Sequence, residues 1–214
     1  MAQAAQGTRV IPANIGGALK KVAQSSIAFK QGLTNMSSAP ESHPASATDT
    51  LKMLVRYKAW ANQLTFESVM NLPAGEALRP RQTRFGNMVH TLNHVYVVDD
   101  IFRHHLQGRK HPYTARNTEH PSPLGDLWHA VQAMDRWYIE LVDTWSAEDL
   151  SKVVHFEFVG GGKGLMTQEE IVLHLVNHAT YHRGFVGDMM YQIPFTPPSN
   201  DLPVFIRDHY RKAR

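Results

Sequence analysis

The segment 174–185, HLVNHATYHRGF, places His174, His178 and His182 at intervals of four residues. In a helix, residues four apart share a face and have Cβ atoms about 5–6 Å apart. Two imidazoles at that spacing can bind one divalent ion at about 2.1 Å. All three cannot, because His174 and His182 would lie about 12 Å apart along the helix axis. One ion would therefore take the pair 174/178 or the pair 178/182.

A second pair of histidines, His90 and His94, has the same spacing within 85–108. One of them, together with a pair from 174–182, would supply three neutral nitrogen ligands. Sites with three protein ligands keep a coordination position open and are typically catalytic, whereas structural sites are closed by four. The alternative is that these rings are hydrogen-bonded core residues. A carboxylate di-iron bundle is excluded, because no glutamate is followed by a histidine three residues later.

The apolar spacing around these histidines predicts an all-α protein. Four long amphipathic helices are expected over about 50–72, 85–108, 123–145 and 168–192. Asp49 or Thr50 would cap the first helix. Ser122 would cap the third, with a proline at its first helical position. Thr167 and Glu170 form a capping box that would open the fourth.

Shorter elements are expected between and after the long helices. The alternating segment VVHFEFV (153–159), followed by glycines, predicts a small hairpin between the third and fourth helices. SAED (146–149) predicts one helical turn, and a short C-terminal helix should run from Asn200 or Asp201 to about residue 212. The predicted fold is a four-helix bundle with a small β excursion and a short C-terminal helix.

One stripe of the fourth helix is predicted to be its buried face, made of Ile171, His174, His178, Tyr181, His182, Phe185 and Met189. A similar inward stripe surrounds His94, made of Asn87, Val97, Val98 and Ile101. The other histidines of the body are expected on the surface or in loops: His104, His105, His111, His120, His129, His155 and His209. The tryptophans are expected in the core or at a dimer contact: Trp60, Trp128, Trp137 and Trp145.

The charge distribution argues against nucleic-acid binding. The chain has 214 residues, with 22 Lys and Arg and 19 Asp and Glu. Residues 1–48 hold four of the basic and one of the acidic residues, which leaves 18 of each in the remainder. Such a body lacks the net basic face that phosphate binding requires. There is no cysteine and no apolar run of 18 residues, so a cysteine nucleophile and a membrane span are not expected.

Residues 1–48 are rich in Ala, Ser, Gln and Gly and lack strong periodicity. We expect a disordered basic extension ahead of one domain over 49–214. If translation begins at Met36, residues 1–35 are instead a start-site artefact. VIPANIGGAL (10–19) is too weakly apolar for a signal-peptide core, and a cytoplasmic location is expected.

Two segments, TLNHVYVVDDIF (91–102) and VNHATYHRGFV (176–186), resemble the signature segments of the DinB family, metal-binding bundles related to YfiT-like proteins. YKAWANQLTFESV (57–69) and PPSNDLPVFIRDH (197–209) resemble its first helix and C-terminal end. The resemblance implies one divalent ion held by His94, His178 and His182, and imidazole ligands suit Zn, Ni, Fe and Mn alike. His90 and His174 become its neighbours and candidates for a catalytic base.

Four further residues are candidates for supporting roles. Asn177 and Tyr181 flank the implied ligands and could hydrogen-bond near the metal, as could Asn93. Asp99 and Arg183 could pair across two helices, or both could be solvated charges. The family usually has Arg-Gly-Gln after the last ligand, but residues 183–185 read Arg-Gly-Phe and lack that amide.

The resemblance implies a metal-dependent enzyme that activates a small thiol or water. It would be a transferase or isomerase using a low-molecular-weight thiol, or a hydrolase, and its nucleophile must come from outside the chain. The alternative is a non-catalytic metal-binding or stress-response protein. The expected partners are a small-molecule substrate and a second copy in a homodimer, with no nucleic acid and no membrane.

Overall fold

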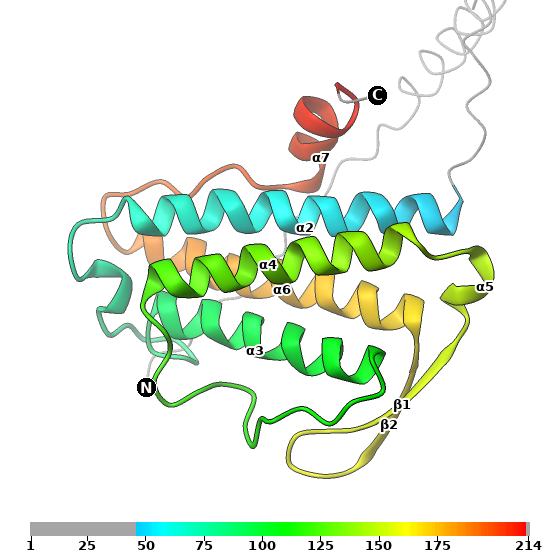
Figure 1. The fold of residues 1–214 in the computed structure, drawn as a ribbon. Coiled ribbons are helices and arrows are strands. Elements are labelled where there is room, and N and C mark those ends of the chain that lie inside the picture. The colour runs from blue at the N-terminus through cyan, green and yellow to red at the C-terminus, as the bar shows by residue number, and fades with distance from the viewer. Residues whose placement is uncertain (1–45, 213–214) are drawn as a thin grey trace, which may run out of the picture. The chain divides into compact units, whose positions relative to one another are not determined.

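A computed structural model of the protein describes residues 46–212, so the expected extension lies almost entirely outside the described residues. Four long helices form a bundle: α2 (Ala47–Met70), α3 (Met88–Leu106), α4 (Leu124–Asp143) and α6 (Gln168–Tyr191) (Figure 1). α2 and α6 run in one direction and α3 and α4 in the other, so the segment 107–123 crosses back along the bundle. The predicted mostly helical fold is confirmed.

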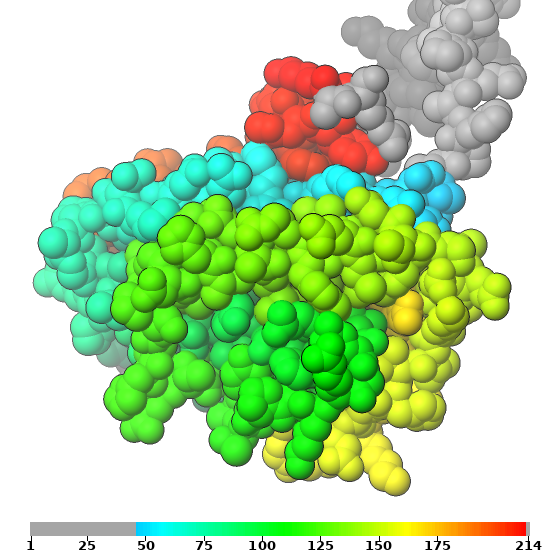
Figure 2. All heavy atoms as spheres, viewed as in Figure 1, coloured from blue at the N-terminus to red at the C-terminus, as the bar shows by residue number. Residues whose placement is uncertain are grey.

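Each long helix packs mainly against two others. α2 packs against α4 and α6, and α3 packs against α6 and α4. Side chains of α2 and α4 meet along much of their length and close that side of the bundle (Figure 2). The two helices that carry the histidine pairs, α3 and α6, are therefore direct neighbours.

Two of the predicted helix starts are wrong by a few residues. α2 is capped by Ser46, whose hydroxyl accepts from the backbone N–H of Asp49 in a capping box, so residues 46–48 belong to the folded body. This earlier box satisfies the first backbone donors before the predicted caps are reached. In α4, Pro123 itself is the N-cap, with an extended ψ of 144°, and the predicted cap Ser122 lies one residue outside.

The shorter predicted elements are present. α5 (Ala147–Leu150) starts with a capping box of Ser146 and Asp149. Strands β1 (Val153–Glu157) and β2 (Lys163–Thr167) pair antiparallel, and their turn uses three successive glycines, 160–162, at positive φ. After α6, the described residues form α7 (Leu202–Phe205) and a π-helical turn, Ile206–Tyr210. A 3-10 turn, Glu76–Leu78, lies between α2 and α3. None of the described helices has the length and apolarity needed to cross a membrane.

Thr167 joins the hairpin to α6 through the predicted capping box. Its hydroxyl accepts from the Glu170 N–H at 3.1 Å, and its own N–H donates to the Glu170 carboxylate at 2.7 Å. Thr167→Ala is expected to lower the free energy of unfolding by about 1 kcal/mol, whereas Thr167→Ser keeps the hydroxyl and should stay near the wild type. Urea unfolding measures both variants, and equal loss in the two would rule out the hydroxyl as the cause.

The bundle interior holds a network of buried charges to which each long helix contributes one. These are Lys58 of α2, Asp99 of α3, Asp135 of α4 and Arg183 of α6. The Lys58 Nζ atom lies 2.7 Å from a carboxylate oxygen of Asp99 and 2.7 Å from one of Asp135. Two positive and two negative groups thus balance inside the protein, which charged side chains require when they are removed from water.

Arg183 joins this network through an amide. It donates to the side-chain oxygen of Asn62 at 3.0 Å, and the Asn62 amide donates to Asp135 at 2.9 Å. Asp99 pairs with Lys58 rather than with Arg183. The predicted pairing of Asp99 with Arg183 is therefore wrong, and the solvated alternative is wrong too, because Lys58 lies between the carboxylates and all these groups are buried.

Candidate metal centre

Three histidine rings converge between α3 and α6: His94 from α3, and His178 and His182 from α6. One ring nitrogen of each lies within 4.8 Å of the others. The Nε2 atoms of His94 and His178 are 3.0 Å apart. Two nitrogens on one tetrahedral ion, with bonds of about 2.1 Å, would be about 3.4 Å apart. The rings are thus close to the spacing that one shared ion requires.

The other two candidates lie outside this group. The His174 ring is near His178, with centroids 5.4 Å apart, but it also packs against Phe102 at 5.2 Å. His90 lies one turn before His94, where its backbone carbonyl accepts a hydrogen bond from Asn117. Of the two pairs that the spacing allowed on α6, it is 178/182 that meets His94.

The predicted buried stripe of α6 is only partly right. His182 is buried, His174 and His178 are half-buried, and Tyr181 is 63% exposed. The face that enters the core is a neighbouring stripe that includes Val172, Leu175, Val176, Ala179, Arg183, Val186 and Met190. This stripe buries more hydrocarbon, so the histidines lie at the border between the core and two cavities.

The crossover segment 107–123 orients His94. Its Nδ1 lies 2.5 Å from the backbone carbonyl of Arg116, which can only accept, so Nδ1 carries the proton and Nε2 presents its lone pair to His178. Asn93 donates to the side chains of Asn117 and Thr118 and so fixes the same segment. The contribution of Asn93 therefore passes through the crossover rather than through a direct contact with the three rings.

The three rings are neutral at neutral pH because they are removed from water. Burial lowers the pKa of His178 to about 2 and of His182 to about 4, and the neighbouring imidazoles add to both shifts. Burial also lowers the pKa of His94. Neutral imidazole is the form that binds divalent metals.

The donor set fits a divalent transition-metal ion. The Nδ1 atoms of His178 and His182 are buried and have no hydrogen-bond partner within residues 46–212. Because His178 faces His94 through Nε2, its Nδ1 lies on the other side of the ring and calls for an ordered water rather than for the ion. Over the same residues, no carboxylate or further histidine joins the group to close it with a fourth ligand. The three nitrogens suit Zn, Ni, Fe or Mn, all of which bind imidazole.

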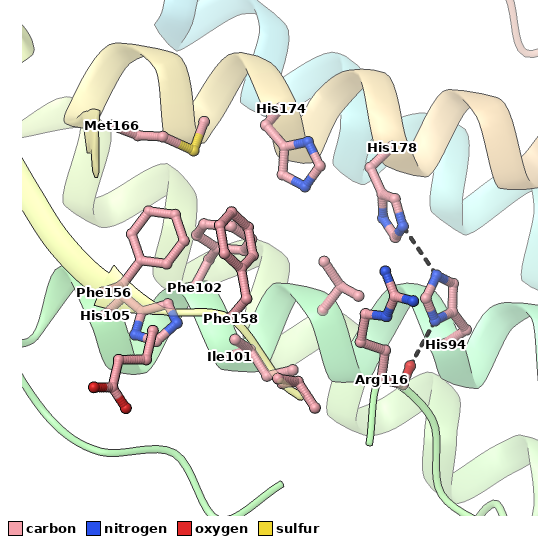
Figure 3. Close-up of a pocket in the computed structure, with 13 residues that line it drawn as sticks. His94, Ile101, Phe102, His105, Arg116, Phe156, Phe158, Met166, His174 and His178 are labelled. Atoms are coloured by element: carbon pink, nitrogen blue, oxygen red, sulfur yellow. Dashed lines mark hydrogen bonds between the residues drawn. The ribbon is translucent and has the colours of Figure 1, made fainter. Parts of the chain in front are cut away.

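Two cavities adjoin the three rings. One of about 280 Å³ lies beside His94 and His178 and is lined mainly by hydrocarbon and aromatic side chains (Figure 3). The other, of about 540 Å³, lies beside His94 and His182 and includes Arg84 and Arg116. The candidate centre is therefore accessible from both sides.

The flanking residues predicted from sequence contribute less than expected. Asn177 is exposed and has no hydrogen bond to the three rings. Tyr181 packs its ring edge on His182 at a centroid distance of 5.0 Å, and on Phe185, which stands where the family usually has an amide. Trp145 is buried, and none of the four tryptophans lines either cavity.

Several residues of the site were not identified from the sequence. His105, expected on the surface, is half-buried on the cavity wall, where burial lowers its pKa to about 4. Phe85 stacks on His94 at a centroid distance of 4.4 Å. Arg116 contributes its carbonyl to His94 from a loop whose sequence carries no periodic signal. Only the tertiary structure could reveal these contacts.

Comparison with known proteins agrees with this architecture. The chain matches the model of the DinB family over residues 20–213, a range that includes both histidine helices. It is also 25% identical over 158 residues to the Protein DinB of Bacillus subtilis (strain 168), an alignment that covers 72% of this chain and 91% of that protein. The chain therefore belongs to the DinB family.

Proposed function

We propose that the protein is a metal-dependent enzyme whose one divalent ion is held by His94, His178 and His182. The observation that carries this proposal is a group of three converging, neutral imidazoles that adjoins two cavities. A divalent ion bound there would lower the pKa of a bound thiol or water and polarise a carbonyl group. The open side of the group leaves space for such a ligand.

The chain's own residues have three tasks in this proposal. The Arg116 carbonyl holds His94 in the tautomer that directs Nε2 inward. The apolar wall of the smaller cavity keeps water from that side of the rings. His174, half-buried on the cavity wall and kept neutral by burial, could accept a proton, whereas His90 does not line the cavity.

An external thiol is the nucleophile that we favour, because the chain has no cysteine and a thiolate is a good ligand for an imidazole-bound Zn or Ni ion. The reaction would be a transfer or isomerisation that uses a low-molecular-weight thiol, with hydrolysis as the water-dependent variant. Small thiols are kept reduced in the cytosol, and this supports a cytoplasmic location.

A non-catalytic metal-binding or stress-response role is the second candidate. Its support is that Glu157, an exposed residue of the hairpin, is the one carboxylate that lines the apolar cavity, so no acidic base lies beside the three rings in the described part of the chain. A protein that only holds an ion needs no such base.

Metal loading and thiol-dependent activity test the proposal in turn. Elemental analysis of protein purified from metal-replete medium is expected to show about one divalent ion per chain. Free metal at a hundred times its Kd should stabilise the chelator-treated protein by about 2.7 kcal/mol, measured by urea unfolding. Absence of a bound ion would overturn both candidates. If the metal-loaded protein accelerates no reaction between small thiols and electrophiles, the non-catalytic role is the candidate that is left.

A further inference from the structure

The cavity beside His94 and His178 has a distinct shape and composition. It has a volume of about 280 Å³ and lies between α3, α6 and the β1–β2 hairpin (Figure 3). A cavity of about 150 Å³ is enough to hold benzene. Its wall is mainly hydrocarbon and aromatic: Val98, Ile101, Phe102, Phe156, Phe158 and Met166. It can therefore hold an apolar group larger than a single ring.

The two ends of this cavity differ in polarity. Phe102, Phe156 and Met166 lie toward one end, whereas Arg116 extends toward His94 and His178 at the other (Figure 3). The aromatic end is well packed, since the rings of Phe102 and Phe156 meet edge to face at 5.4 Å. A ligand that fits this division has an apolar body and one polar head next to the histidines.

Charge identifies the head. No carboxylate within residues 46–212 forms an ion pair with the Arg116 guanidinium, which also borders the second cavity beside His182. Glu157 is the one carboxylate that lines this cavity; it also borders a hollow next to His105 and His111, where Arg116 has no part, and it forms no ion pair with Arg116. The positive end of the cavity is thus free for an anion, and arginine binds planar carboxylates through two parallel hydrogen bonds.

We propose that this cavity binds an organic carboxylate with an aromatic or branched hydrocarbon body. The carboxylate lies against Arg116, and the body lies against Ile101, Phe102 and Met166. The atoms next to the carboxylate then face His94 and His178. This assignment rests on the proposed function and deepens it by naming the class of the substrate.

Two probes that share a body and differ in the head test the assignment. They are 4-phenylbutanoate and 4-phenylbutan-1-ol, titrated into the metal-loaded protein by calorimetry. Arg116→Gln is expected to weaken the carboxylate about tenfold and to leave the alcohol within about twofold. His94 keeps its contact in this variant, because that contact is to the backbone of residue 116.

Filling the apolar end should affect both probes. Ile101→Trp projects a larger side chain into the cavity and is expected to weaken both by at least about tenfold. Because Ile101 is 5% exposed and its replacement could disturb folding, Met166→Trp fills the same cavity from the half-buried hairpin. Circular dichroism and thermal unfolding establish that each variant is folded.

The outcomes separate this proposal from the metal site. Three outcomes would each overturn the substrate assignment. The first is that the wild-type protein binds neither probe, and the second is that Arg116→Gln weakens both probes equally. The third is that folded Ile101→Trp and Met166→Trp bind the probes as the wild type does. All titrations are repeated after chelation. If the carboxylate binds to Arg116 and not to the metal ion, Arg116→Gln must weaken its binding in the chelated protein as well. Metal content is measured on the same samples, so a chain that binds the carboxylate but no ion contradicts only the proposed function.

Discussion

Replacing His178 with alanine is expected to abolish stoichiometric metal binding. His178 belongs to both pairs that the spacing allows on α6, and it lies 3.0 Å from His94 between Nε2 atoms and 4.5 Å from His182 between centroids. Changes to residues that merely support metal ligands cost about 10–100-fold in affinity, so loss of a ligand should cost more than about 100-fold. Calorimetric titration of the chelator-treated protein with Zn or Ni measures the affinity, and elemental analysis measures the stoichiometry.

His174→Ala is the matched control for this experiment. It removes the same side chain from the same helix one turn earlier, where the ring packs on Phe102 and lies outside the converging group. His174→Ala should lower the metal affinity by less than about tenfold, the smallest loss expected for a residue that supports the ligands. If His174→Ala removes the ion as completely as His178→Ala does, the ion is held by the pair 174/178 and our assignment of His182 is wrong.

Replacing Lys58 with methionine is expected to lower the free energy of unfolding by about 3–5 kcal/mol, because it leaves the carboxylates of Asp99 and Asp135 buried without their shared cation. Burial alone would lower the pKa of Lys58, but Asp135 and Asp99 outweigh it and raise the pKa to about 12. The ammonium group is therefore charged throughout the physiological range. Urea unfolding followed by circular dichroism measures the loss.

Arg56→Met controls for the loss of a basic residue from the same helix. Arg56 pairs with Asp143 at 2.7 Å, but the two side chains are 38% and 40% exposed, so this variant should lose less than about 1 kcal/mol. Adding Asp99→Asn and Asp135→Asn to Lys58→Met removes the unpaired charges and should restore part of the stability. A Lys58→Met variant that loses no more than Arg56→Met would show that the buried network does not stabilise the fold.

The stability lost in Lys58→Met should also depend on pH. Burial raises the pKa of Asp99 to about 6 despite the attraction of Lys58, above the value of about 3.9 in an unfolded chain. A carboxyl group of this kind favours the folded state when protonated, and that contribution is lost as the pH rises through the folded pKa. Without Lys58 this pKa rises further, so the deficit should be larger at about pH 8 than at about pH 5.

The sequence by itself determined the local structure. The helical periodicity identified the four long helices, and Thr167 with Glu170 located the start of α6 to the residue. The alternation in 153–159 and the following glycines identified the hairpin. These features depend on residues within one or two turns of each other, so they can be read from spacing. The two histidine pairs are local in the same sense, since four-residue spacing places each pair on one helix face.

Which histidines meet was decided by packing between distant segments. His94 and His178 are 84 residues apart in the chain, and the axial register of α3 against α6 determines that His94 faces 178/182 rather than 174/178. The resemblance to a family selected this pair, but the spacing alone did not. The same holds for Lys58 and Asp135, 77 residues apart, and for the Arg116 carbonyl on His94, 22 residues away. Local sequence patterns carry no information on such contacts, because burial and register depend on the packing of the whole bundle.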